Sequence, residues 1–177
     1  MSRVKHGLLA ALLLAQAAVA GDAPAIRSRM SLPADFPAGF EIYDTVVSRE
    51  DRLVTLRHAN AAAVRAARAG MPLPEGSIIV VVQHTLLLDD QGQAHAGSVQ
   101  SSAAMAMRKG WGAAVPPALR NGNWDFALFN ARGQRRDQLD QTPCLACHQP
   151  LARTSHVFTL AALREHALHT APRSAPR

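Results

Sequence analysis

The stretch SIIVVVQHTLLL, residues 77–88, decides the fold class of this chain. Its β-branched run from Ile78 to Val82 is apolar on both faces, which predicts a central β-strand that is covered on both sides. The turn-forming residues 89–92 follow directly, so we expect residues 98–107 to return as the neighbouring strand. The sequence therefore predicts an antiparallel sheet built around residues 77–88.

Other segments extend this sheet on either side. Apolar and polar residues alternate, as in half-buried strands, over residues 40–47, 52–56 and 123–130. Residues 61–69 predict a short helix that begins after Asn60 as its N-cap and ends at Gly70. The predicted fold class is α+β: a mostly antiparallel β-sheet with a few short helices in a single domain.

The first 20 residues have the pattern of an export signal. Arg3 and Lys5 precede residues 8–20, which are apolar except for Gln16, and Ala18-Val19-Ala20 forms a small-x-small cleavage site. An apolar segment of this length falls short of the roughly 20 residues that span a bilayer. We therefore expect a cleaved secretory signal peptide over residues 1–20, a periplasmic location and no stable membrane insertion.

The rest of the chain divides into three predicted parts. Prolines interrupt residues 21–38, which predicts an irregular N-terminal arm. Residues 39–170 form the predicted domain, and the Pro-, Arg- and Ser-rich residues 171–177 form a frayed tail. A chain of 177 residues is long enough for one such domain.

The charge pattern argues against one class of partner. The net charge is +6, but the 19 Lys and Arg residues are scattered along the chain. No run of them is longer than two residues, as in Arg135-Arg136. Proteins that bind nucleic acids usually concentrate their basic residues in a stripe or patch. We therefore expect no nucleic-acid partner.

The sequence CLACH, residues 144–148, carries the chemistry. Its pattern C-x-x-C-H is the attachment site of c-type haem. Cys144 and Cys147 are spaced to form thioethers with two vinyl groups of the porphyrin, and His148 is then placed to become the proximal iron ligand. A single motif predicts one covalently attached haem c, bound by Cys144, Cys147 and His148, with His148 as the metal ligand.

Three other interpretations of this motif remain open. A zinc site would need His148 together with His156, His166 or His169, because the chain has no second Cys pair. A thioredoxin-like dithiol would require a βαβ unit, which the sequence does not predict. A structural disulfide would close only a very small loop and add little stability.

The order of several short motifs resembles the cytochrome P-460 family, which includes the β-type cytochromes c-prime. The resemblance runs from about residue 57 to residue 159 and ends shortly after the haem motif. Its landmarks are residues 58–60, 72–77, 89–92, 110–112, 121–126 and 157–159. The resemblance implies a mostly antiparallel fold, a homodimer, and a five-coordinate haem with an open distal face.

The resemblance also implies two activities. Members that oxidise hydroxylamine carry a haem cross-linked to a lysine, whereas β-type cytochromes c-prime have an apolar distal pocket and bind nitric oxide or carbon monoxide. We expect an exported mono-haem c-type cytochrome that binds a small diatomic or nitrogenous ligand such as nitric oxide, transfers electrons to a redox partner protein, or does both. The alternatives are hydroxylamine oxidation and a haem-free exported dithiol or disulfide domain.

Departures from the family pattern favour binding over oxidation. The cross-linking lysine belongs on the strand after the Pro-x-Gly turn, but residues 78–83 contain none, and Lys109 is the only Lys after the signal peptide. The acid that assists proton transfer also lacks an obvious counterpart, since only Asp137 and Asp140 precede the motif closely. Ser155-His156 replaces the usual Asp and aromatic residue.

The distal side has several candidate residues. Possible sixth ligands are His58, His84, His95, His156, Met71, Met105 and Met107. Of these, His84 shares the side-chain direction of Val80 and Val82, and His156 is close enough in sequence to pack on the proximal side instead. The aromatic residues expected mainly in the core, with one or two walling the pocket, are Trp111, Trp124, Phe126, Phe129 and Phe158.

Overall fold

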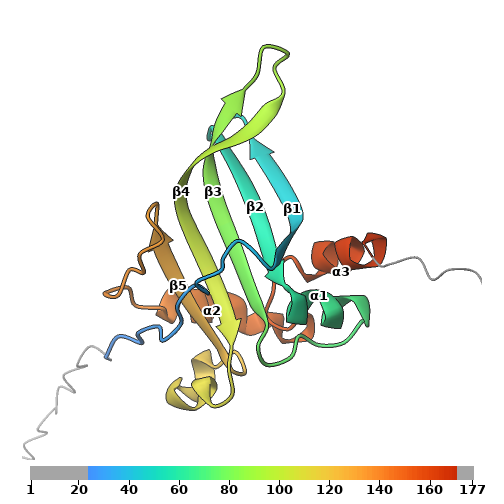
Figure 1. The fold of residues 1–177 in the computed structure, drawn as a ribbon. Coiled ribbons are helices and arrows are strands. Elements are labelled where there is room, and N and C mark those ends of the chain that lie inside the picture. Colours follow the sequence, from blue (N-terminus) through green and yellow to red (C-terminus); the bar gives the residue numbers. More distant parts are fainter. Residues whose placement is uncertain (1–23, 171–177) are drawn as a thin grey trace, which may run out of the picture.

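The computed structural model describes residues 24–170 (Figure 1). The expected signal peptide and the expected C-terminal tail lie outside the described residues. Within residues 24–170, no helix has the length and apolar character needed to cross a membrane.

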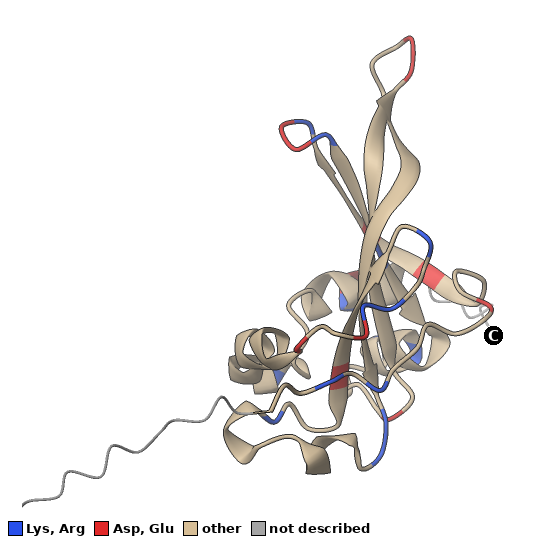
Figure 2. Ribbon diagram, turned by 90° about the vertical axis from the view of Figure 1, so that its left-hand side faces the viewer, with Lys and Arg blue, Asp and Glu red and all other residues tan. Residues whose placement is uncertain are grey.

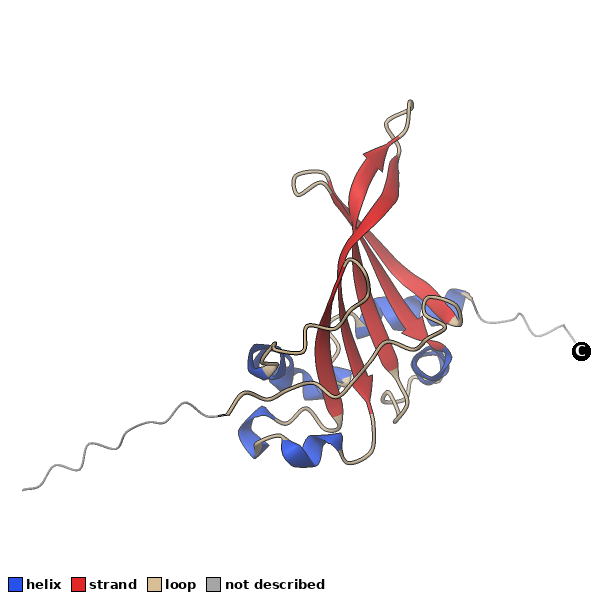
Figure 3. Ribbon diagram, turned by 60° about the vertical axis from the view of Figure 1, so that its left-hand side comes forward, coloured by secondary structure: helices blue, strands red, loops and turns tan. Residues whose placement is uncertain are grey.

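A five-stranded antiparallel sheet forms the centre of the molecule (Figures 1 and 3). Its strands, in spatial as well as chain order, are β1 (Phe40–Ser48), β2 (Leu53–Asn60), β3 (Ile78–Leu88), β4 (Ala94–Met107) and β5 (Trp124–Asn130). The strand predicted to be central, β3, is the third of the five. The α+β fold class is confirmed, and the β3–β4 hairpin projects beyond the rest of the sheet (Figure 3).

The helices follow the strands or connect them. They are α1 (Ala61–Arg68), α2 (Thr142–His148) and α3 (Leu160–His169), with three 3-10 helices, η1 (Trp111–Ala114), η2 (Pro117–Leu119) and η3 (Gln149–Thr154). The predicted cap of α1 is confirmed, since Asn60 Oδ1 accepts a hydrogen bond from the Ala63 N–H at 3.2 Å. Helices α2 and α3 were not predicted, because neither segment has a strong helical pattern.

One face of the sheet is covered by helices. Ile79, Met105 and Phe126 project from three neighbouring strands into a core with the buried side chains of α1, α2 and α3. In that core, Leu145 of α2 and Leu163 of α3 are completely inaccessible to solvent. The three helices therefore attach to the sheet through one continuous apolar cluster.

The opposite face is covered by the N-terminal arm, residues 24–39. The arm, blue in Figure 1, crosses the front of the sheet while α2 and η3 lie behind it. Met30 of the arm is buried against Val80, Val82 and Phe129. The apolar run of β3 is thus covered on both sides, once by helices and once by irregular chain.

Hydrogen bonds attach the arm to β5 and to the loop that follows it. The carboxylate of Asp125, which is 1% exposed, accepts bonds from Ser28 Oγ at 2.5 Å and from the Arg29 N–H at 3.0 Å. Arg135 Nη1 also donates to the Met30 carbonyl at 2.6 Å. These bonds satisfy a buried carboxylate and give an arm without secondary structure a defined path.

Candidate functional site

The C-x-x-C-H motif occupies helix α2. Cys144 and Cys147 are three residues apart, so one helical turn brings their side chains to the same side of α2. Cys144 is half-buried, Cys147 is exposed, and both thiols are free. Leu145, between them, is completely buried, and its carbonyl accepts a bond from Asn121 Nδ2 at 3.0 Å. Burial of Leu145 therefore fixes which side of α2 presents the two thiols.

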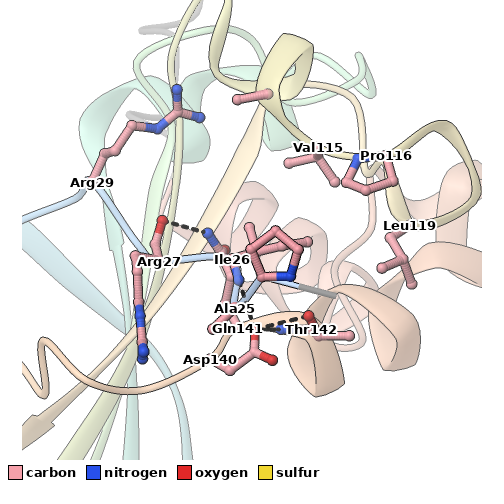
Figure 4. A pocket seen from close by; sticks show the side chains of 12 residues that line it. Ala25, Ile26, Arg27, Arg29, Val115, Pro116, Leu119, Asp140, Gln141 and Thr142 are labelled. Carbon is pink, nitrogen blue, oxygen red and sulfur yellow. Dashed lines mark hydrogen bonds between the residues drawn. The ribbon is translucent and has the colours of Figure 1, made fainter. Parts of the chain in front are cut away.

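The segment before α2 is anchored on two sides. Gln141 is 2% exposed; its Oε1 accepts from the Phe126 N–H at 3.0 Å, and its Nε2 donates to the Arg27 carbonyl at 3.2 Å (Figure 4). Asp140 Oδ1 accepts from the N–H groups of Ile26 and Thr142, both at 3.0 Å. Strand β5 and the arm together hold the N-terminus of α2 in place.

His148 has a defined tautomer. Its Nδ1 lies 2.7 Å from the backbone carbonyl oxygen of His156. Because a carbonyl can only accept, Nδ1 carries the proton, and Nε2 keeps the lone pair that could bind a metal. Burial lowers the pKa of His148 below its ordinary value, and the hydrogen bond to His156 offsets this only in part. Burial therefore favours the neutral form of the ring, which is the form that binds a metal.

Two aromatic rings contact the His148 imidazole. The centroid of Phe126 lies 4.6 Å away with the planes tilted by 47°, and that of Phe158 lies 4.8 Å away in an edge-to-face arrangement. Phe126 is buried in the sheet, whereas Phe158 is 59% exposed. Phe158 is therefore not a core residue and lies beside the imidazole, as expected for one or two of the aromatic residues. The two contacts restrict rotation of the imidazole.

A cavity of about 360 Å³ lies between α2 and the sheet. Its apolar wall consists of Ile79, Val81, Ala103, Ala104, Met105, Phe126, Ala127, Leu128 and Pro143. The other described residues that line it are Cys144, Cys147 and His148, and none of the twelve is Lys, Asp or Glu. Two free thiols and a neutral imidazole beside an apolar wall are the donor set of a c-type haem. The residues present therefore fit this group.

The structure separates the candidate sixth ligands. Met105 lines this cavity, and Met107 packs against the same apolar cluster. His58 and His84 instead line a cavity of about 460 Å³ on the arm-covered face. His84 does share its direction with Val82, but that direction leads away from the motif. Neither histidine can therefore contact a group held by α2.

The remaining candidates lie elsewhere. Met71 is 58% exposed, and His95 lies on the β3–β4 hairpin with its Nε2 2.8 Å from Asp89 Oδ2. His156 packs on the side of His148, as predicted. Lys109 is exposed, follows β4, and does not line the cavity. The candidate site thus contains one predicted distal candidate, Met105, besides the motif itself.

The alternatives to haem receive little support from the geometry. Within residues 24–170 no three His, Cys, Asp or Glu side chains gather around a common point. His166 bonds Glu41 at 2.9 Å, and His169 bonds the Glu165 carbonyl at 2.7 Å, so both are engaged elsewhere. Burial raises the pKa of the Cys144 thiol, whereas a reactive dithiol has a lowered pKa.

Another cavity, of about 490 Å³, lies where the arm meets α2 (Figure 4). Its polar groups already bond one another: Asp140 with Ile26 and Thr142, and Gln141 with Arg27. It lies beside the segment that anchors α2 and does not include the motif. We regard it as part of that anchoring region.

Two features of the site could not be read from the sequence. The acceptor for His148 is a backbone carbonyl, which no side-chain pattern reveals. Gln141 looks like an ordinary polar residue, and only its burial between β5 and the arm shows its role. A buried amide next to a motif leaves no signal in one sequence.

The chain matches the model of a known protein family. The family model described as Cytochrome P460 matches residues 33–159, which is more than two thirds of the chain and includes all five strands and the whole motif. No curated protein matches the chain. In Figure 2, basic residues (blue) and acidic residues (red) are scattered over several loops and strands of the described chain.

Proposed function

Because the chain belongs to the cytochrome P460 family and is therefore a c-type haem protein, we propose that it is exported and carries a single covalent haem that binds a small neutral ligand such as nitric oxide. The observation that supports this most directly is the cavity between α2 and the sheet. Its lining contains the two thiols and the imidazole of the motif together with nine apolar residues.

The residues of the site have two roles, which are to hold the haem and to line the cavity beside it. Cys144 and Cys147 would hold the porphyrin edge, and His148 Nε2 would bind the iron from one side. A haem held in this way supplies an iron centre that can take up a diatomic ligand and exchange one electron. Ile79, Val81 and Leu128 present only hydrocarbon to the cavity, which disfavours anions and favours neutral ligands.

Electron transfer is compatible with the same site. Cys147 is exposed, so a porphyrin edge attached there would reach the surface, where a redox partner protein could approach it. Hydroxylamine oxidation is less well supported, because no Lys, Asp or Glu is among the described residues that line the cavity. Such an activity would lack both a cross-linking amine and a nearby proton carrier.

We also propose that the protein is a homodimer. Edge strand β1 exposes three apolar side chains, Ile42, Val46 and Val47, with exposed fractions of 47%, 41% and 41%. An apolar edge strand is a common surface for association. Sedimentation analysis of the purified protein tests this: a single species at monomer mass at all concentrations would refute it.

The decisive experiment for the haem is expression with a c-type maturation system, followed by optical spectroscopy. We expect haem that remains on the chain after denaturation and a high-spin reduced spectrum that changes when nitric oxide is added. A strongly red-shifted Soret band with steady turnover of hydroxylamine would replace binding by oxidation. Protein without covalent haem would refute both and leave the dithiol interpretation.

A further inference from the structure

His148 and His156 are joined by two reciprocal hydrogen bonds. The Nδ1–H of His148 donates to the carbonyl of His156 at 2.7 Å, and the Nδ1–H of His156 donates to the carbonyl of His148 at 3.1 Å. Each residue therefore binds the other through one ring and one backbone oxygen. Neither ring can turn without breaking a bond that positions its partner.

The backbone at this point is unusual. Ser155 and His156 both have left-handed conformations, with φ values of 53° and 60°. Residues with a Cβ adopt this region at a cost of roughly 1 kcal/mol or more each. Two successive residues hold it because the His156 N–H donates to the Leu151 carbonyl at 2.8 Å and Ser155 Oγ accepts from the Leu73 N–H at 3.1 Å.

This strained turn directs the chain back toward α2. It follows η3, and it places the His156 carbonyl where the His148 ring can donate to it. The bond from the His148 ring uses a backbone carbonyl, whereas the return bond requires the imidazole of His156. Local strain that the surroundings enforce next to a candidate ligand suggests a functional role.

We propose that His156 is a positioning residue for the candidate iron ligand His148. Its backbone carbonyl orients the His148 imidazole, and its ring, bonded to the His148 carbonyl, keeps that carbonyl of His156 in place, so that a strong ligand would displace His148 less easily. This inference rests on the proposed haem function. The bond from His148 Nδ1–H to a carbonyl makes Nε2 a stronger donor, and partners of this kind alter metal binding about 10- to 100-fold when they are removed.

Two variants separate the ring of His156 from its backbone. His156→Gly keeps the left-handed conformation and removes the ring, since glycine adopts positive φ freely. His156→Asn also tolerates positive φ, and its side-chain amide can donate to the His148 carbonyl in place of Nδ1–H. The pair thus tests the donor group while leaving the turn intact. His95→Asn, on the distant hairpin, is the matched control.

The readouts are the reduction potential and the coordination of the nitric oxide complex. His156→Gly keeps the accepting carbonyl but loses the bond that holds it in place, so the bond from His148 Nδ1–H should weaken. We therefore expect a higher reduction potential and an increase of at most about tenfold in the rate at which nitric oxide displaces His148. Both values should return toward wild type in His156→Asn and stay unchanged in His95→Asn. Optical and electron paramagnetic resonance spectra distinguish five- from six-coordinate nitrosyl haem.

The outcomes are distinct from failure of the proposed function. If the wild type carries no covalent haem, the proposed function fails before the variants are compared. If it carries haem and His156→Gly behaves as the wild type, the positioning role is refuted. Loss of haem attachment in His156→Gly alone would support the role, whereas equal loss in His156→Asn would refute it, because the donor would then be irrelevant.

Discussion

The two faces of the sheet contain cavities of similar size but differ in what covers them. The helix-covered face has a cavity of about 360 Å³, into which α2 brings two thiols and an imidazole. The arm-covered face has a cavity of about 460 Å³ lined by His58 and His84, without a cysteine among its described lining residues. Size therefore does not distinguish the two; the covering element does.

The difference shows what a helix adds to a site. Helix α2 fixes the spacing of Cys144, Cys147 and His148 along one short element, and burial of Leu145 fixes its rotation. The arm attaches mainly through backbone groups and the carboxylate of Asp125, so it stabilises the face it covers without presenting a set of donors. Sites on regular elements hold their residues more precisely than sites on irregular segments.

Removing the donors of the helix-covered face should have the largest effect. We expect Cys144→Ala with Cys147→Ala to abolish covalent haem completely, since no thioether can form. Haem staining of a denaturing gel measures this. The matched control is His84→Ala on the arm-covered face, which should keep its full haem content. Covalent haem in the double variant would contradict the assignment of the site.

Detaching the arm should affect stability and leave the haem in place. Asp125→Ala leaves the Ser28 hydroxyl and the Arg29 N–H without their acceptor, and we expect the free energy of unfolding in urea to fall by about 2 kcal/mol. The exposed hydrogen bond between Ser48 and Asp51, away from the arm, provides a control, because Asp51→Ala should cost less than about 1 kcal/mol. An equal loss in both variants would mean that the arm contributes little.

Adjacent residues of β3 allow a direct comparison of the faces. Val82 lies on the arm-covered face and is 4% exposed. We expect Val82→Ala to lower the free energy of unfolding by about 1–2 kcal/mol and to leave nitric oxide binding unchanged. Val81→Ala enlarges the cavity beside α2, so we expect faster nitric oxide association instead. Stopped-flow measurements on both variants test this. Faster association in Val82→Ala, with no change in Val81→Ala, would contradict a ligand site on the helix-covered face.

The smallest expected effect concerns pH. Burial lowers the pKa of His58 below its ordinary value of 6.5, and the charge of His84 adds to this. The unfolded chain therefore binds a proton that the folded chain does not, so the free energy of unfolding falls as the pH drops below about 6.5. His58→Phe should reduce this fall, as measured by urea unfolding at about pH 7.5 and about pH 5.5. An unchanged fall would mean that other groups cause it.

Local patterns in the sequence predicted much of this structure. The apolar run of β3, the cap at Asn60 and the C-x-x-C-H spacing each depend on a few neighbouring residues, and each was identified. The sequence could not show which face of β3 would receive α2, because both faces are apolar. The sequence therefore predicted that the His84 side chain shares the direction of Val82, but it could not show that this direction leads away from the motif.

What remained hidden depends on contacts between distant segments. The carbonyl of His156 reaches His148 only through a left-handed turn, and Gln141 acquires its role from Phe126 and Arg27, which lie far away in the chain. Helix α3 is short and has no strong pattern of its own. Its position is set by packing against α1, which propensity does not predict.

The path of the arm also has a consequence for the order in which the chain matures. A ribosome delivers residues 24–30 early, but the groups that bind them, Asp125, Asp140 and Gln141, follow about a hundred residues later. Contacts so distant in sequence form late and slowly. The arm, although it is made before the sheet that it covers, is thus among the last segments to dock.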